Sequence, residues 1–142
     1  AADIGAAGGY FTLRLARRAL HGVATDIDPK PLRELRARAT KAGLRNIETV
    51  HALPDVPSLQ PGAFRAILLS QVDHLLVNRV DYFKRLALAL EEGGVLVVVN
   101  QERYGDACER ALIDAGWLVE RLPLPGQILL RARLKTRSSD PR

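Results

Sequence analysis

The sequence predicts a three-layer α/β fold whose central sheet is mostly parallel and ends in an antiparallel hairpin. Short apolar runs alternate with helical patterns along most of the 142 residues, which is typical of parallel strands joined by crossover helices. The last two apolar runs, 117–122 and 127–134, are separated by too few residues to hold a crossover helix. These two strands must therefore form a hairpin, and the last strand must run antiparallel to a neighbour.

The first half of the chain contains three expected strands and two expected helices. In order, we expect a strand that ends at Ile4, a helix over 9–20, a strand over 22–25, a helix from Asp28 to Gly43, and a strand over 47–51. Apolar side chains that recur every four residues predict the buried face of the first helix, namely Phe11, Leu15 and Ala19. Asp28 before Pro29 is typical of a helix N-cap, and Gly43 is typical of a C-cap.

The second half continues the alternation of strands and helices. A proline-rich loop over 52–62 leads into a strand over 64–70, which is apolar nearly throughout and is expected to be buried on both faces. A helix over 79–90, a turn over 91–94, a β-branched strand over 95–99 and a helix over 106–115 follow. We expect one domain over 1–135 and a disordered polar tail over 136–142.

The composition is that of an ordinary globular domain. Its net charge of +5 comes largely from arginines on predicted helix faces, which is typical of a solvated surface. A nucleic-acid-binding surface is the alternative, but aromatic residues make up only 5% of the chain and no aromatic pattern supports it. No apolar run reaches the ~20 residues that span a bilayer, so we expect no membrane contact. The single cysteine, Cys108, excludes a disulfide framework and favours a cytoplasmic location.

The beginning of the chain is unusual. The sequence contains no methionine, and its first residue, Ala1, already belongs to the first expected strand. A translation product starts with methionine and usually has residues ahead of that strand. We therefore expect that an N-terminal piece is missing from the domain.

The chemistry of this sequence is concentrated in its first 28 residues. The loop over 5–9 is made of glycine and alanine, which let a ligand approach the backbone closely. The second strand then leads to Asp26, whose carboxylate can accept hydrogen bonds from both hydroxyls of a ribose. A loop and an acid in this order predict a mononucleotide-binding half-site at the carboxyl ends of the strands.

These residues resemble those of a known enzyme family. The run Asp3-Ile4-Gly5-Ala6-Ala7-Gly8-Gly9 resembles the D-x-G-x-G-x-G loop of class I S-adenosylmethionine (SAM) dependent methyltransferases, and Tyr10 continues it as is common there. Asp26 with Ile27 is similar to the acidic end of the family's second strand, and 92–94 is similar to its glycine turn. The resemblance covers nearly all of 1–135, and the closing hairpin is also a family feature. It implies a Rossmann-like fold, SAM as the cofactor and methyl transfer as the reaction.

The resemblance also implies which residues bind the cofactor. Asp26 would hold the ribose, Ile27 would contact the adenine, and Asp3 would orient the loop or meet the ammonium group of the cofactor. Gln71 would contact the amino-acid portion or the methyl acceptor. The full set of expected cofactor contacts is Asp3, Gly5, Ala6, Ala7, Gly9, Tyr10, Asp26, Ile27, Leu53 and Gln71.

Three positions depart from the family's pattern. Ala7 stands at the middle glycine of the loop, and Leu53 stands where an acid usually contacts the adenine, although Asp55 could serve instead. Arg65 replaces an acid before the fourth strand whose role is usually structural. Losing one hydrogen bond to the adenine costs about 0.5–1.5 kcal/mol, or about threefold to tenfold in affinity. We therefore still expect an active enzyme.

Contacts with the methyl acceptor are expected at the end of the fourth strand, over 70–74. His74 is the candidate general base, because an unperturbed histidine titrates near neutral pH; a local hydrogen bond ahead of a helix is the alternative role. Three scattered histidines and one cysteine predict no metal site. The chain has no appended recognition domain and no N-P-P-Y-like motif, so we expect a small-molecule acceptor.

Two other functions fit parts of the sequence. A nicotinamide-binding domain would need glycines at Ala7 and Tyr10 for its G-x-G-x-x-G fingerprint, and neither position has one. A degenerate methyltransferase-like scaffold that binds a protein or RNA partner without catalysis would explain Ala7, Leu53 and Arg65 as eroded positions. A salt-sensitive affinity for nucleic acid without affinity for SAM would favour this scaffold. The sequence predicts no oligomeric state.

Overall fold

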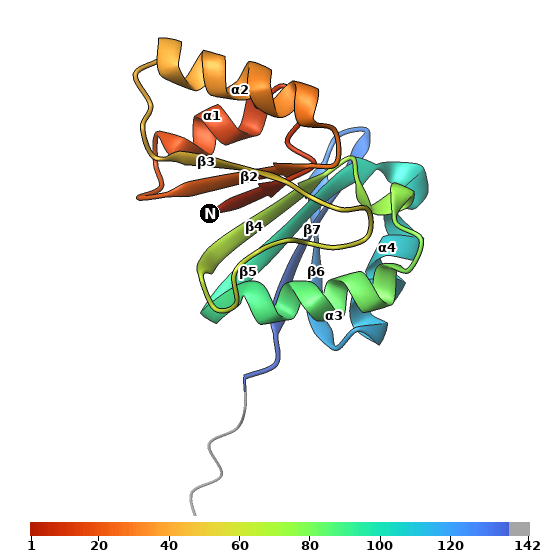
Figure 1. The fold of residues 1–142 in the computed structure, drawn as a ribbon. Helices are drawn as coiled ribbons and strands as arrows, with labels where there is room; N and C mark the ends of the chain where they lie inside the picture. Colours follow the sequence, from red (N-terminus) through yellow and green to blue (C-terminus); the bar gives the residue numbers. More distant parts are fainter. Residues whose placement is uncertain (137–142) are drawn as a thin grey trace, which may run out of the picture.

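In a computed structural model that describes residues 1–136, the chain forms one seven-stranded sheet with helices on both faces (Figure 1). The strands are β1 (Ala2–Ile4), β2 (Gly22–Asp26), β3 (Ile47–His51), β4 (Phe64–Ser70), β5 (Leu90–Gln101), β6 (Trp117–Leu124) and β7 (Gln127–Leu134). Their order across the sheet is β3-β2-β1-β4-β5-β7-β6. The neighbours among β1 to β5 pair in parallel, whereas β7 is antiparallel to both β5 and β6. The predicted fold class is confirmed, including the hairpin.

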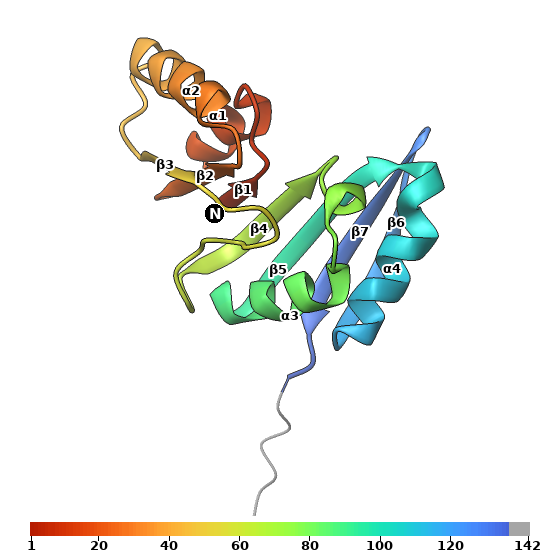
Figure 2. The same cartoon turned by 45° about the vertical axis from the view of Figure 1, so that its right-hand side comes forward.

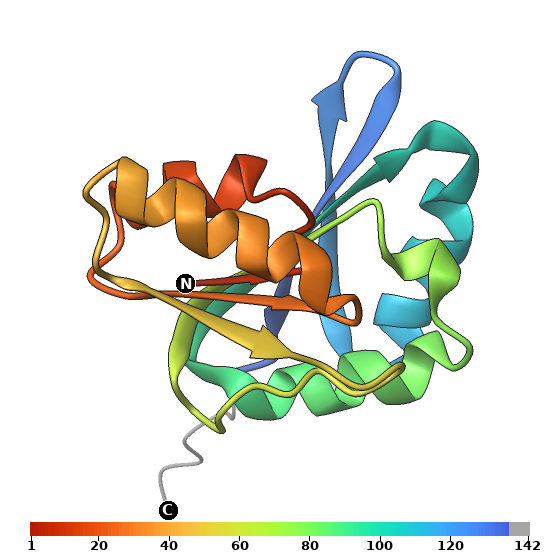
Figure 3. The same ribbon diagram turned by 45° about the horizontal axis from the view of Figure 1, so that its top comes forward.

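The helices form two layers, one on each face of the sheet. α1 (Tyr10–Ala16) and α2 (Pro29–Lys41) lie on one face, and α3 (Arg79–Ala89) and α4 (Gly105–Asp114) lie on the other (Figures 1 and 3). Two short 3-10 helices, η1 (Asp73–Leu75) and η2 (Glu102–Tyr104), follow β4 and β5. The connection from β3 to β4 runs along the α3 side of the sheet (Figure 2), where Leu59 packs against the main core.

The ends of α2 are where the sequence predicts them. The Asp28 side chain accepts a hydrogen bond from the amide of Lys30 at 2.9 Å, and Pro29 opens the helix. After the helix, Gly43 has a φ of 70°, a left-handed conformation that glycine adopts without strain. The buried side chains of the helix are Leu32, Leu35 and Ala39.

The prediction of which side chains form the buried face of α1 is wrong. The residues expected on that face are Phe11, Leu15 and Ala19. The buried side chains of the helix are instead Thr12 and Ala16, because the Thr12 hydroxyl donates a hydrogen bond to the buried Asp3 carboxylate at 2.7 Å. This contact turns Thr12 toward the sheet and leaves Phe11 37% exposed.

α1 also ends four residues earlier than predicted, at Ala16 rather than residue 20. The side-chain amide of Asn46 donates to the carbonyl oxygens of Ala16 at 2.7 Å and Ala19 at 2.9 Å. A side chain from a distant loop therefore satisfies carbonyl groups at the end of the helix. This interaction leaves no signal in the sequence of α1 itself.

Two expectations for β4 and β5 need correction. β5 begins at Leu90, which pairs with Phe64, so the residues predicted as a turn lie within an irregular strand. Only one face of β4 is fully buried: Ile67 and Leu69 are inaccessible, whereas Leu68 is only half-buried. The reason is that α1 contacts β1 and β2 and α2 contacts β2 and β3, so neither lies over β4.

The hydrophobic core consists of two clusters of different size. The large cluster lies between the sheet and the layer of α3 and α4, and it includes Phe83, Leu96 and Trp117. The small cluster lies under α1 and α2 and consists of Ala6, Ala24, Leu32 and Leu35, with Leu13 packed against it. The loop over 5–9 therefore contributes to the small cluster, through Ala6.

Two further expectations concern membrane contact and the tail at the end of the chain. None of the described helices is long and apolar enough to cross a bilayer. Of the tail expected over 136–142, residues 137–142 lie outside the part that the structure describes. Cys108, on α4, is a free and buried cysteine.

Candidate cofactor site

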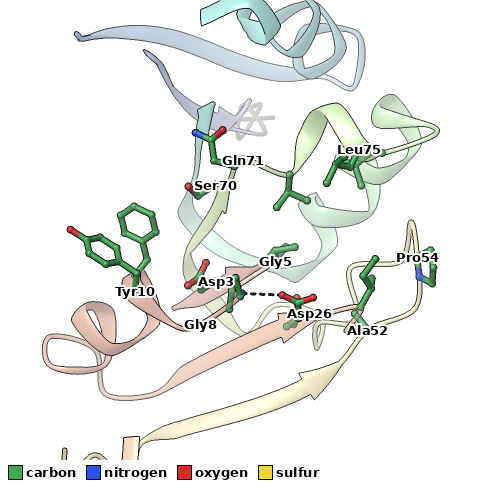
Figure 4. Close-up of a pocket in the computed structure, with 18 of the residues that line it drawn as sticks. Asp3, Gly5, Gly8, Tyr10, Asp26, Ala52, Pro54, Ser70, Gln71 and Leu75 are labelled. Atoms are coloured by element: carbon green, nitrogen blue, oxygen red, sulfur yellow. Dashed lines mark hydrogen bonds between the residues drawn. The ribbon is translucent and has the colours of Figure 1, made fainter. Parts of the chain in front are cut away.

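A cavity of about 790 Å³ opens at the carboxyl ends of β1, β2 and β4 (Figure 4). This volume is within the range of small-molecule and cofactor sites. Nine of the ten residues predicted to contact the cofactor line it, namely Asp3, Gly5, Ala6, Ala7, Tyr10, Asp26, Ile27, Leu53 and Gln71. Gly9 does not line it. The fold thus gathers the predicted residues into one site, while their contacts with a ligand stay a prediction.

The loop between β1 and α1 is shaped by three left-handed residues. Gly5, Ala7 and Gly9 have φ values of 68°, 47° and 82°. A Cβ atom at Gly5 would overlap Val72, and one at Gly9 would overlap Leu35. Glycine is therefore required at these two positions by packing as well as by backbone conformation. Ala7 keeps the left-handed conformation with a side chain, which is a strained state.

Asp26 connects the end of β2 to this loop. Its Oδ2 atom accepts a hydrogen bond from the Ala7 amide at 2.9 Å (dashed in Figure 4), and its Oδ1 atom accepts one from the Asp28 amide at 3.0 Å. Each carboxylate oxygen can accept two hydrogen bonds, so both oxygens keep one free lone pair. Asp26 therefore positions the loop and still offers two acceptors to a ligand.

Asp3 lies at the bottom of the cavity and is 2% exposed. Burial raises the pKa of this carboxyl to about 6; the hydrogen bond from Thr12 opposes the shift, and the charge of Asp26 adds to it. A carboxylate that is costly to bury alone is well suited to hold a positively charged group. The geometry fits the predicted contact with an ammonium group.

Large apolar side chains surround the mouth of the cavity. Ile27 and Leu53 follow β2 and β3 and are 60% and 67% exposed. Tyr10 and Phe11, at the start of α1, pack edge to face with ring centroids 5.0 Å apart. Exposed apolar residues gathered at one cavity indicate a site for a partly apolar ligand.

Gln71, directly after β4, is another non-glycine residue of the cavity wall with a left-handed backbone, as Ala7 and Asp55 are. Its φ is 59°, and its amide donates a hydrogen bond to the Val99 carbonyl oxygen at 2.8 Å. This bond fixes the backbone at the end of β4, and Figure 4 shows Ser70 and Gln71 together at one side of the cavity. Strained residues held by their surroundings are often found at functional sites.

Sequence reasoning missed several residues of the wall. They include Thr25 on β2, Leu75 and Leu76 after β4, and Tyr82 on α3. The Thr25 hydroxyl is buried and has no hydrogen-bond partner among the described residues, so a ligand could satisfy it. The position of Thr25, directly before Asp26, is the one signal that could have identified it. Burial and the neighbouring Asp55 raise the pKa of the Tyr82 hydroxyl.

His74, the candidate general base, does not line the cavity, although Val72 and Leu75 on either side of it do. Its Nδ1 atom lies 2.9 Å from the Asn100 side-chain amide nitrogen, and its ring stacks on Tyr104 with centroids 4.3 Å apart. The position of His74 is thus next to the cavity wall. A catalytic role for it stays a prediction.

Comparisons with known proteins agree with this geometry. A family profile described as "Methyltransferase domain" matches residues 1–94, and the chain belongs to this family. A ubiquinone biosynthesis O-methyltransferase from Xylella fastidiosa is 27% identical over 121 residues, which are 85% of this chain and 49% of the relative. The chain spans about half the length of the curated relatives it matches.

Solved structures share the fold. A SAM-dependent methyltransferase from Aquifex aeolicus superposes with a TM-score of 0.84 at 17% identity, covering 92% of this chain and 79% of that one. A ribosomal protein L11 methylase from Lactobacillus delbrueckii superposes with a TM-score of 0.79 at 20% identity, covering 94% and 68%. The predicted family, the Rossmann-like fold, the methyltransferase class and SAM as that class's cofactor are confirmed.

Proposed function

We propose that this chain binds SAM in the cavity at the carboxyl ends of β1, β2 and β4 and transfers a methyl group to a small-molecule acceptor. One observation carries the proposal: the glycine and alanine loop, the buried Asp3 and the acceptors of Asp26 converge on a single cavity of about 790 Å³. When bound, SAM supplies a methyl group on a positively charged sulfur, which an acceptor atom can displace in line. The chain's part is to bind, orient and exclude water.

Each end of the cavity offers groups of the required kind. The free lone pairs of Asp26 can accept hydrogen bonds from two ribose hydroxyls, and Ile27 and Leu53 offer apolar faces to the adenine. Asp3 offers a buried carboxylate to the ammonium group. These three features support a cofactor that is both charged and partly apolar.

The Asp55 carboxylate already accepts a hydrogen bond within the chain. It can therefore only partly replace the acid that the family usually has at the position of Leu53. Its Oδ1 atom accepts a hydrogen bond from the Val77 amide at 2.9 Å, and its own φ is 58°. The second oxygen is the one that could reach the adenine from this part of the wall. We expect the adenine to be held mainly by apolar contacts, with modest affinity.

A small molecule is the acceptor that the observations favour. The exposed Tyr10, Phe11 and Leu75 make the mouth of the cavity apolar and aromatic. The curated relatives are named for an O-methyl transfer in ubiquinone biosynthesis, which is small-molecule chemistry. We also propose a cytoplasmic location, which fits a single free and buried cysteine.

Calorimetric titration with S-adenosylhomocysteine, the demethylated product of SAM, tests the cofactor site. We expect the chain to bind it, and Asp26→Ala to bind at least about tenfold more weakly, because two charge-assisted hydrogen bonds are lost. Asp28→Ala is the matched control: it removes the N-cap of α2 two residues away and lies outside the cavity wall. It should lower the free energy of unfolding by about 1 kcal/mol and leave the affinity unchanged.

Because Asp26 also holds the Ala7 amide, each variant needs a check of folding by urea denaturation. A folded wild-type chain that does not bind S-adenosylhomocysteine contradicts the proposal. Equal affinity of the wild type and Asp26→Ala contradicts the role of Asp26. Salt-sensitive binding of RNA without binding of the cofactor product would instead favour the noncatalytic scaffold.

A further inference from the structure

A cluster of polar side chains lies behind the cavity wall, where β4 and β5 end. It consists of Asp73 and His74 of η1, Asn100 of β5 and Tyr104 of η2. Asp73 and Asn100 are fully buried, and the Asn100 Nδ2 atom lies 2.6 Å from Asp73 Oδ1 and 2.9 Å from His74 Nδ1. The proposed function leaves this cluster unexplained, although η1 directly follows the wall residue Val72.

The orientation of the Asn100 amide is determined by its neighbours. The backbone amide of Gln101 donates a hydrogen bond to Asn100 Oδ1 at 2.8 Å, so this atom must be the oxygen. A flipped amide would place two donors against each other here and an oxygen against the Asp73 carboxyl group. The Nδ2 atom therefore faces Asp73 and His74, and its two hydrogens match these two acceptors.

This orientation fixes the tautomer of His74. Because Asn100 Nδ2 can only donate hydrogen bonds, His74 Nδ1 must accept one. The neutral ring therefore carries its proton on Nε2. The parallel stack on Tyr104, with 8° between the ring planes, holds the ring in this plane. Among the described residues, no hydrogen bond engages Nε2, and the His74 residue is half-buried.

We propose that Asn100 locks His74 in the Nε2–H tautomer, so that His74 offers a hydrogen-bond donor, instead of a general base, beside the cavity wall at the end of β4, where contacts with the methyl acceptor are expected. A donor at this position recognises an acceptor oxygen that arrives already deprotonated, as an anion, and it takes no proton from it; the anion displaces the methyl group from the sulfonium sulfur, which leaves as a neutral thioether. Asn100 is then a positioning residue, and Asp73 holds Asn100. The role in transfer rests on the proposed function, but the tautomer is a property of the free chain.

Long-range ¹H–¹⁵N correlation NMR of the free chain, labelled with ¹⁵N-histidine and ¹⁵N-asparagine, tests the tautomer. We expect an unprotonated Nδ1 and a protonated Nε2 for His74, with a scalar coupling between Nδ1 and the Asn100 Nδ2 nitrogen. His74→Gln identifies the His74 signals. In Asn100→Leu, which keeps the size of the side chain, the coupling should disappear and the tautomers should mix.

A proton on Nδ1, or the same His74 spectrum in the wild type and in a folded Asn100→Leu, overturns the proposal. Trp117 fluorescence reports whether the variant is folded, because Trp117 is 2% exposed within the main core. These spectra need no cofactor. The tautomer therefore stands or falls separately from the binding of S-adenosylhomocysteine.

Binding of 4-nitrophenolate to the chain loaded with S-adenosylhomocysteine tests the donor, because its absorbance reports the anion directly. His74→Gln keeps an N–H donor near the Nε2 position and should bind within about threefold of wild type, whereas His74→Phe should bind at least about tenfold more weakly. The uncharged 4-nitroanisole should not distinguish the variants. Equal losses in His74→Gln and His74→Phe, or no loss in His74→Phe, contradict the donor. If S-adenosylhomocysteine binds and 4-nitrophenolate does not, the donor role fails and the cofactor site remains.

Discussion

Ala7 holds a backbone conformation that glycine adopts without strain. Its φ of 47° is left-handed, and its amide is held there by Asp26. A left-handed backbone costs about 1–2 kcal/mol for a residue with a Cβ atom. Glycine avoids this cost, but it loses about 0.5–1 kcal/mol because its unfolded chain has more conformational entropy to lose on folding. We therefore expect Ala7→Gly to raise the free energy of unfolding by about 0.5 kcal/mol in urea denaturation.

Gly8 provides the matched control in the same loop. Its φ is outside the left-handed range, and an added Cβ atom would meet only the flexible end of Arg38, at 3.3 Å. Gly8→Ala should therefore be neutral or slightly stabilising. A loss of stability in Ala7→Gly, combined with a gain in Gly8→Ala, would show that the loop has a different backbone in solution.

Asp3 links the cofactor site to pH. Its pKa is raised from 3.8 to about 6, mainly because burial disfavours the charged form, so folding favours the protonated carboxyl. The contribution of Asp3 to stability is therefore present in full below pH 3.8 and is lost as the pH rises through about 6. A shift of this size corresponds to about 3 kcal/mol.

Asp3→Asn removes this titration while keeping an oxygen for the Thr12 hydroxyl. We expect the variant to be more stable than the wild type at neutral pH and to lose the pH dependence of stability between about pH 4 and about pH 6, measured by urea unfolding. Its affinity for S-adenosylhomocysteine should fall, because the ammonium group loses its carboxylate. The affinity of the wild type should fall about tenfold per pH unit below about pH 6. Parallel stability curves for the two chains would contradict this assignment.

At the scale of elements, the sequence predicts a helix accurately where its ends are encoded locally. α2 has Asp28, Pro29 and Gly43 at its ends, and all three act there as expected. α1 has no such signals at its end. It is terminated by Asn46, a residue of a distant loop, and no periodicity in α1 could reveal this.

The packing of α1 against α2 depends on the absence of a side chain at Gly9. The backbone of Gly9 is left-handed, and a Cβ atom would overlap the buried Leu35 of α2. Left-handed strain and overpacking each cost about 1–3 kcal/mol. We expect Gly9→Ala to lower the free energy of unfolding by about 2–6 kcal/mol, measured by urea denaturation.

Gly43→Ala separates the two contributions, because its backbone is also left-handed but nothing lies within 4 Å of an added Cβ atom. It should cost only about 1–2 kcal/mol. In a double-mutant cycle, Gly9→Ala and Leu35→Ala should together cost less than the sum of their separate effects, because they share one contact. If the two effects are additive, the loss of stability in Gly9→Ala comes from its left-handed backbone alone and not from an overlap with Leu35.

At the scale of the whole molecule, the residues of one wall of the cavity can be predicted from the sequence, whereas those of the opposite wall cannot. Asp3, Asp26 and the loop between them are close in sequence, so their spacing reveals the site. The opposite wall, with Leu76 and Tyr82, comes from segments that only the folded sheet brings to the same place. Their residue types are ordinary core residues, and no local pattern distinguishes them from the rest of the core.

The two core clusters predict where ligand binding stabilises the chain. The small cluster under α1 and α2 buries little apolar surface, whereas the large one anchors β4, β5 and β7 under α3 and α4. Hydrogen exchange followed by mass spectrometry should therefore show lower opening free energies in α1 and α2 than in the central strands. S-adenosylhomocysteine at about 100 times its dissociation constant should slow exchange about hundredfold in the openings that abolish binding.

This protection should be local. It should be concentrated in the loops over 5–9 and 26–28 and in α1, because these segments surround the site and pack on the small cluster. The hairpin of β6 and β7 lies outside the cavity wall and should exchange at nearly the same rate with and without the ligand. Equal protection of the hairpin and of α1 would show that the two clusters open together. In that case the ligand would stabilise the chain through global unfolding alone, and the division of the core into two clusters would have no energetic meaning.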